Sequence, residues 1–215
     1  MGERRYKLAP SWRGLATQAH ADCRFVTIII GAIRVNDLDM RDPSSVSQVV
    51  EGMIAGFRRD WSGLTKGRAF PGLWWRGQFE LELHREIPRE SHREALLKDL
   101  GLDVPALGRD ERVLVVHVHL VAVLPPGIDA DDLRARFTRT WPGRWRTEVK
   151  GLYAHQTTEE AVTRLCSYVH KHRLEYSSGG LAGEPVRFED AYGIGWGRFV
   201  NKVYRAFSRV FRSKL

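Results

Sequence analysis

The stretch "VLVVHVHLVAVL", residues 113–124, contains ten apolar residues, and the other two are His117 and His119. An apolar run of this kind is typical of a buried β-strand. Because successive side chains of a strand point to opposite faces, His117 and His119 share one face, while Val116 and Val118 share the other. The stretch therefore predicts a sheet with one apolar face and one face that carries two imidazoles.

The segments around this stretch show the periodicities of further strands and helices. β-Branched residues or a clean polar–apolar alternation mark the strands, and apolar residues at helical spacing mark the helices. Asp129 predicts one helix start, and the capping box Thr157-x-x-Glu160 predicts another, for a helix of four to five turns. Strands are expected at residues 23–35, 73–86, 113–124 and 144–155, and helices at 43–61, 91–100, 129–141 and from Thr157 onward.

This order of elements, β-α-β-β-α-β-α, predicts an α+β fold. We expect a central antiparallel sheet with helices packed on one face, in a ferredoxin/RRM-like βαββαβ core followed by one more helix. Residues 1–176 are expected to form this domain, and residues 177–215 a loop and a basic amphipathic C-terminal helix. That helix would dock on the domain with a basic outer face, contact DNA or a partner, or lie on a membrane surface.

The chain of 215 residues has a net charge of +8, and most of its positive charge is arginine. Such a balance favours polyanionic partners, nucleic acid first and an acidic membrane surface second, although a soluble protein can also simply be basic. Arginine suits bidentate recognition of phosphate. Four tryptophans are expected either in the core or as surfaces on which unpaired bases stack: Trp74, Trp75, Trp141 and Trp145.

The sequence shows no signal for export or membrane insertion. The first ten residues, "MGERRYKLAP", are charged, and no window reaches the roughly 18 apolar residues of a membrane span. Cys23 and Cys166 lie far apart without CxxC spacing, which argues against a disulfide framework or a structural zinc site. A cytoplasmic protein is expected.

The face with the two histidines is a candidate metal site. Glu80 and Glu82 share one face of the strand at 73–86, which is expected to pair with the histidine strand as its antiparallel neighbour. Two imidazoles and one carboxylate suit a divalent ion such as Mn²⁺ or Mg²⁺ when the substrate adds phosphate oxygens. The alternative is a pair of half-buried histidines bonded to neighbours beside a solvated strand face.

The segment "SYVHKH", residues 167–172, is the second candidate constellation. Tyr168 and Lys171 are three residues apart on the expected helix and are therefore neighbours. A tyrosine hydroxyl needs nearby positive charge or a base to act as a nucleophile, and Lys171, Arg164 and a metal ion would supply that charge. The alternative is a tyrosine at the boundary of an amphipathic helix, with a surface lysine.

These motifs resemble those of the HUH (His-hydrophobic-His) endonucleases, and most closely the rolling-circle replication initiators (Rep) of plasmids. "VVHVHLVAVLP" resembles the HUH strand, "SYVHKH" the Tyr-x-x-Lys helix, "FVTIII" the first-strand motif and "RGQFELEL" the strand with a glutamate. The resemblance spans about residues 24–173, with the elements in the family's order.

The resemblance implies a role for each residue that matches a motif. His117 and His119 would bind the metal, and Glu82, or else Glu80, would complete the ligand set. Tyr168 would be the nucleophile, and Lys171 would position or activate it. Further contacts to DNA are expected from the basic residues of the same helix and of the tail: Arg164, His172, Arg205 and Arg209.

The implied activity is nicking and rejoining of single-stranded DNA at a rolling-circle origin. Tyr168 would form a 5′-phosphotyrosine and release a 3′ hydroxyl, and a host helicase and polymerase would be further partners. One departure is Arg164, which stands where some initiators carry a carboxylate one turn before the tyrosine, while Glu160 lies two turns back. The alternatives are a single-tyrosine transposase or relaxase, and a non-catalytic nucleic-acid-binding module in which the histidines are structural.

Overall fold

The computed structural model describes residues 10–66, 70, 72–84, 87, 89–102, 107–108, 110–169, 175–176 and 198–199. Its elements in chain order are α1 (Pro10–Ala16), a 3-10 turn (His20–Asp22), β1 (Cys23–Asn36), α2 (Asp37–Arg41), α3 (Ser44–Lys66), β2 (Trp74–His84), α4 (His92–Asp99), β3 (Glu111–Val123), α5 (Ala130–Thr140), β4 (Thr147–Gly151), α6 (Thr158–Val169) and β5 (Glu175–Tyr176).

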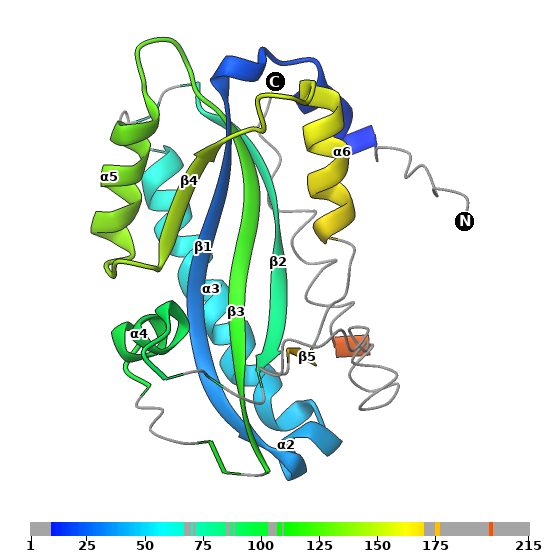
Figure 1. The fold of residues 1–215 in the computed structure, drawn as a ribbon, viewed down its shortest axis with the longest axis vertical. Coiled ribbons are helices and arrows are strands. Elements are labelled where there is room, and N and C mark those ends of the chain that lie inside the picture. Colours follow the sequence, from blue (N-terminus) through cyan, green and yellow to red (C-terminus); the bar gives the residue numbers. More distant parts are fainter. Residues whose placement is uncertain are drawn as a thin grey trace.

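The strands form one sheet in the order β4-β1-β3-β2-β5 (Figure 1). The pairs β1–β3, β1–β4 and β2–β3 are antiparallel, and the two-residue β5 pairs with β2 in parallel. The predicted α+β class with a central antiparallel sheet is confirmed. The histidine strand β3 is central, with a long hydrogen-bonded partner on each side.

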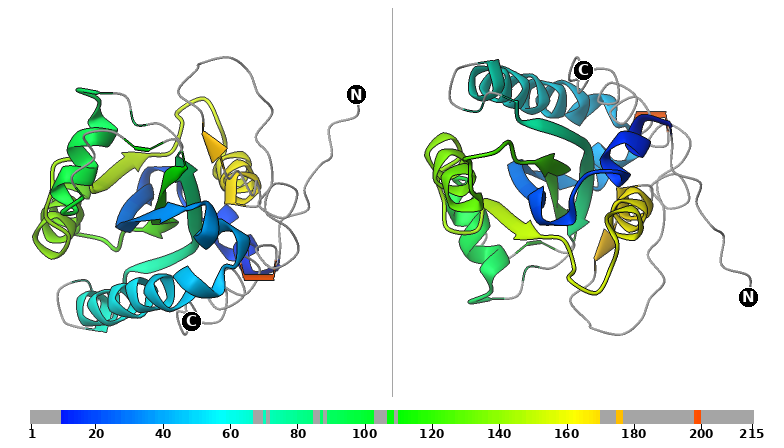
Figure 2. Two further views of the ribbon diagram at one scale, coloured as in Figure 1. Left: turned by 90° about the horizontal axis from the view of Figure 1, so that it is seen from below. Right: turned by 90° about the horizontal axis from the view of Figure 1, so that it is seen from above.

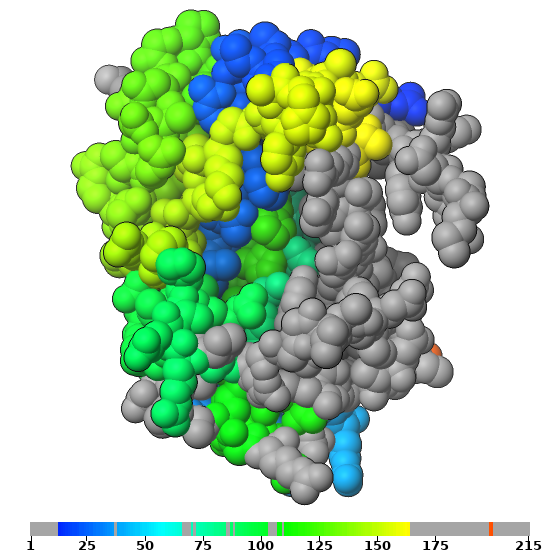
Figure 3. Space-filling model, viewed as in Figure 1, coloured from blue at the N-terminus to red at the C-terminus, as the bar shows by residue number. Residues whose placement is uncertain are grey.

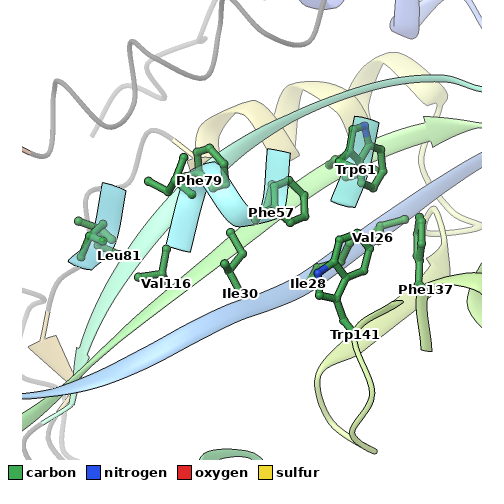
Figure 4. Close-up of a cluster of buried hydrophobic side chains, with 14 of the residues drawn as sticks. Val26, Ile28, Ile30, Phe57, Trp61, Phe79, Leu81, Val116, Phe137 and Trp141 are labelled. Atoms are coloured by element: carbon green, nitrogen blue, oxygen red, sulfur yellow. The ribbon is translucent and has the colours of Figure 1, made fainter. Parts of the chain in front are cut away.

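The helices α3 and α5 cover one face of the sheet and bury the main core, as the alternation in β3 predicts. Val116, Val118 and Leu120 of β3 lie in this core. Four aromatic rings from α3, α5 and the residue after α5 pack together there, with centroid separations of 5.2–6.2 Å: Phe57, Trp61, Phe137 and Trp141 (Figure 4). Because the apolar side chains of each strand must be buried against these helices, the alternate side chains point to the opposite face.

Among the described residues, helices cover the opposite face of the sheet at its two ends. Leu15 of α1 and Val162 of α6 pack at one end against Val121 and its neighbours. Leu97 of α4 packs at the other end against Val113 and its neighbours. Figure 1 shows α3 behind the sheet, with α4 at its lower left and α6 at its upper right, and Figure 2 shows the same elements from two further sides. The band between the two ends carries the histidines.

A β-bulge in β1 keeps both faces in register. Ile29 lies opposite His117, but the next pair along is Gly31 with Val116, so Ile30 is the extra residue. The guanidinium of Arg146 donates to the carbonyls of Ile29 and Ile30, at 3.1 and 3.0 Å. These bonds anchor the segment before β4 to the bulge.

The predicted elements differ from the structure mainly at their ends. β4 spans only Thr147–Gly151 of the predicted strand at 144–155, and it follows a turn in which Gly143 has a φ of +128° and Arg146 bonds to the bulge through its side chain. α1 and α2 have no counterpart in the prediction. The helix start at Asp129 and the capping box at Thr157 are confirmed. Of the predicted C-terminal helix the structure describes only Arg198 and Phe199, and Phe199 is buried in the main core.

The tight contact between β2 and β3 gives the first prediction. A Cβ at Gly77 would lie 2.5 Å from Leu120 Cβ and 2.7 Å from the His119 carbonyl oxygen. Gly77→Ala should therefore destabilise the protein by about 1–3 kcal/mol, because the two strands must separate to admit the methyl group. Urea denaturation measures the change. The matched control Gly52→Ala, on open space in α3, should stabilise by about 0.5–1 kcal/mol. A stable Gly77→Ala variant would contradict this close approach.

Candidate metal centre

The register of the sheet places one glutamate directly beside the two histidines. Glu80 of β2 is the pairing partner of His117, and Gln78 is the partner of His119. On the other side of β3, Thr27 of β1 is the partner of His119. Both neighbours of β3 therefore contribute polar side chains to the same face.

The polar atoms of Glu80, His117 and His119 converge on one point. Oε2 of Glu80 lies 3.1 Å from Nε2 of His117 and 3.1 Å from Nε2 of His119. Two ligand atoms bound at about 2.1 Å and at right angles around one ion are about 3 Å apart. One ligand atom from each of the three residues lies within 4.8 Å of the other two. Glu80, His117 and His119 can therefore hold a metal ion.

Contacts from β1 orient the ring of His119. Thr27 Oγ1 lies 2.9 Å from His119 Nδ1, and the ring of Phe25 stacks on the imidazole with a centroid separation of 5.3 Å. Because Nδ1 is occupied by the hydroxyl, the other nitrogen is the one presented to Glu80. A hydrogen bond that fixes the distal nitrogen is the usual support of a metal-binding histidine.

The second predicted carboxylate, Glu82, lies one step away from this group. It stands opposite Val115 rather than a histidine. Its Oε2 is 3.2 Å from Nε2 of His84 and 4.0 Å from Nδ1 of His117. That Nδ1 is buried and has no hydrogen-bond partner among the described residues. Of the two candidate glutamates, Glu80 is thus the one in the ligand group. Glu82 lies near the other ring nitrogen of His117, Nδ1.

Burial and neighbouring charges shift the pKa values of the histidines and glutamates in this cluster. Burial disfavours protonation of His117, but the hydrogen bond to Glu80 and the charges of Glu80 and Glu82 outweigh it, so the pKa of His117 is raised. Burial lowers the pKa of His119. For Glu82, burial opposes ionisation, but the hydrogen bond to His84 and the charge of His117 outweigh it and hold its pKa at about 2. Both glutamates of the cluster have lowered pKa values and are ready to bind a cation.

The centre is accessible from one side. The side chains of His119 and Glu80 are 20% and 13% exposed, while that of His117 is 5% exposed. In the space-filling view, atoms of β1 and β3 form the floor of a hollow between α6 and α4 (Figure 3). A ligand bound at this face would reach the open side of Glu80 and His119.

The helix α6 brings the backbone of Tyr168 to the level of the histidines. Val162 packs beside Val121 of β3, and from there α6 runs in the opposite direction to β3 (Figure 1). The six residues from Val162 to Tyr168 advance about 9 Å along a helix. The two to four residues from Val121 back to His119 and His117 cover about 7–13 Å of strand.

The remaining predicted residues are only partly described. Tyr168 and Arg164 lie on the backbone of α6, but their side chains are not among the described ones. Four others lie outside the described residues altogether: Lys171, His172, Arg205 and Arg209.

The sequence interpretation missed three residues that shape the centre. Thr27 is a polar residue inside the apolar stretch "FVTIII", and Phe25 is its neighbour on the same face. His84 continues the polar alternation of β2 beyond Glu82. The alternation of these strands was the signal that could have found them.

No family model, curated protein or solved structure matches this chain. Among the helices that the structure describes, none combines the length and the apolar character of a membrane span. The geometry of the centre is therefore the main support for any function.

The ligand group predicts how Mn²⁺ affinity responds to single substitutions. Glu80→Gln should lower the affinity by about tenfold to a hundredfold, because the amide removes the anionic oxygen between the two imidazoles. The matched variant Glu82→Gln, on the same face of β2, should lower it less. Isothermal titration calorimetry measures both. A larger loss for Glu82→Gln would show that Glu82, and not Glu80, is the carboxylate ligand.

The raised pKa of His117 predicts a pH dependence of metal binding. An imidazole must be neutral to bind a metal, so protons compete with Mn²⁺ below the pKa of His117. Because that pKa is above the ordinary value, the affinity should begin to fall at a higher pH than for an ordinary histidine. The fall should be about tenfold per pH unit for one displaced proton. An affinity that does not change from about pH 8 to pH 5.5 would contradict this assignment.

Proposed function

We propose that this protein nicks and rejoins single-stranded DNA by metal-dependent transesterification through Tyr168. The observation that carries the proposal is the convergence of Glu80, His117 and His119 on one point at a partly exposed face. Three protein ligands leave coordination positions for oxygens of a substrate. The net charge of +8 favours a polyanion as that substrate.

The donor set fits a catalytic divalent ion. Two nitrogens and one carboxylate oxygen suit Mn²⁺, while Mg²⁺ prefers oxygen ligands throughout. We propose Mn²⁺ as the ion to test first, with Mg²⁺ as the second. When bound, such an ion would polarise the scissile phosphate and offset the negative charge that develops on it.

The residues around the ion have separate positioning roles in this proposal. Thr27 and Phe25 hold the imidazole of His119, so its Nε2 keeps one direction. Glu80 lies between the two histidines and keeps the ligand group assembled before the ion arrives. Such preorganisation matters because a ligand displaced by 1 Å no longer aligns the phosphate with its nucleophile.

The covalent step exchanges one phosphodiester for another. The phenolic oxygen of Tyr168 forms a bond to phosphorus and loses its proton, while the bond from phosphorus to the 3′ oxygen breaks and that oxygen takes up a proton. The 5′ phosphate stays on the tyrosine, and the 3′ hydroxyl leaves. Because the bond energy is kept, the reverse reaction rejoins the strand without another energy source. The level of the Tyr168 backbone along β3 is compatible with this attack.

The biological role that we propose is initiation of rolling-circle replication, from the resemblance to the HUH initiators. A cytoplasmic location and cooperation with a host helicase and polymerase belong to the same proposal. The single-tyrosine transposases and relaxases use the same chemistry, so the site alone does not separate these roles. The DNA to which the protein becomes joined would distinguish them.

The experiment that tests the chemistry uses labelled single-stranded oligonucleotides and Mn²⁺. The parent protein should release a 3′ hydroxyl fragment and retain the other fragment as a covalent adduct on Tyr168, identified by peptide mass spectrometry. Tyr168→Phe should reduce adduct formation by about a thousandfold or more, because it removes the nucleophile. Tyr153→Phe, which changes an exposed tyrosine outside the centre, should react like the parent.

Two results would contradict the proposal. Undiminished cleavage by Tyr168→Phe would exclude this tyrosine as the nucleophile. Tight binding of oligonucleotides with Mn²⁺ bound but without any cleavage would favour the non-catalytic binding module.

A further inference from the structure

We propose that Trp145, with Arg144 and His92, forms a stacking subsite for an unpaired base of single-stranded DNA, about two to three nucleotides from the phosphate at the metal centre. The subsite rests on the proposed function, because it assigns a path to that substrate. It is a separate site, formed by the segment before β4 and by the first turn of α4.

Trp145 differs from the other tryptophans of the chain whose packing is described. Trp75 and Trp141 are buried in the main core, at 8% and 3% exposed, and Trp74 packs beside the cluster of α1 and α6. Trp145 is 37% exposed and belongs to no core cluster. An aromatic ring held at the surface is available for a ligand with a flat apolar face.

The surroundings of Trp145 suit a nucleobase and its phosphate. The guanidinium of Arg144 lies over the indole, 4.9 Å from the ring centroid. The imidazole of His92 lies 4.1 Å from the indole, tilted by 46°. Bases stack on aromatic rings and on guanidinium planes, and arginine also pairs with phosphate. All three side chains are exposed, so a base can join this group from solvent.

The segment that carries Trp145 is fixed rather than free to move away. Arg146, the next residue, donates two hydrogen bonds to the carbonyls of Ile29 and Ile30, and its own carbonyl accepts from the amide of Ile29 at 2.8 Å. Gly143 turns the chain with a φ of +128°, and a Cβ added there would lie 3.0 Å from Oδ2 of Asp99 in α4. A fixed platform loses little conformational entropy when a base stacks on it.

The same contacts set how far the backbone next to Trp145 lies from the strand that carries the histidines. Arg146 bonds to Ile29, Ile29 is opposite His117, and His117 is opposite Glu80. Neighbouring strands are about 4.8 Å apart, so the backbone at Arg146 is about 10 Å from that at His117. At about 3.4 Å per nucleotide of a stacked strand, two to three nucleotides span this distance.

Trp145 also lies on the correct face of the sheet. It contacts His92 of α4, and α4 packs through Leu97 on the face that carries the histidines. In Figure 3, α4 and the segment leading into β4 adjoin each other at the margin of the hollow floored by β1 and β3. The single-stranded DNA would therefore run from Trp145 across β1 to the metal centre.

The experiment measures binding of single-stranded oligonucleotides by fluorescence anisotropy in the presence of EDTA, so that cleavage does not contribute. Trp145→Leu keeps an apolar side chain but removes the ring, and it should weaken binding by about 5- to 100-fold. Trp145→Phe should recover part of the loss. Leu38→Ala, which changes an exposed apolar residue on α2, should bind like the parent. Unchanged thermal unfolding and Mn²⁺ affinity of Trp145→Leu show that the fold and the metal centre are intact.

A scan with single abasic nucleotides locates the stacked base. In the parent, one abasic position about two to three nucleotides from the cleaved bond should weaken binding. Trp145→Leu should be insensitive to an abasic nucleotide at that position, because the interaction is already lost. The subsite is wrong if the losses of affinity caused by the abasic nucleotide and by Trp145→Leu simply add, or if Trp145→Leu binds like the parent.

The outcomes separate the subsite from the proposed chemistry. Normal cleavage with no effect of Trp145→Leu overturns the subsite alone. Weaker binding by Trp145→Leu in a protein that never cleaves overturns the transesterification and leaves the subsite in place. A parent protein that does not bind single-stranded DNA overturns both.

Discussion

The centre depends on the register between β3 and its two neighbours. A shift of one residue would turn His117 and His119 toward α3 and α5, because side chains alternate between the faces of a strand. The apolar residues of the opposite face prevent that shift, since it would expose them and bury the imidazoles in the aromatic core. The geometry of the polar cluster is therefore fixed by hydrophobic burial on the side of the sheet that it does not touch.

The same burial makes the cluster dependent on its own charges. A carboxylate at Glu80 is stabilised by the neighbouring imidazoles, and the raised pKa of His117 reflects the reciprocal effect. Removing one partner of a buried ion pair costs about 3–5 kcal/mol, because the remaining charge is left without compensation. A divalent cation would supply positive charge at the point where the three ligand atoms lie within 4.8 Å of one another. The cluster thus already brings together the atoms that a metal ion needs.

The sequence could predict the two faces of β3 but not which glutamate meets the histidines. The alternation around His117 and the capping box at Thr157 are local signals, and both are confirmed by the structure. The pairing of Glu80 with His117 depends on the long connection between β2 and β3, whose path leaves no local pattern. The segment before β4 likewise depends on a distant contact, the bonds of the Arg146 side chain to the bulge in β1.

The partial cover of the histidine face also limits the shape of a substrate. In the part of the chain that the structure describes, α1 and α6 pack over one end of this face and α4 packs over the other, and the centre lies in the band between them. A duplex is stiff over about 150 base pairs and keeps its bases stacked inside. A single strand bends readily and can turn individual bases outward onto an aromatic ring. For the proposed activity, the position of the metal ligands between two helix-covered ends therefore favours a single strand over a duplex as the substrate.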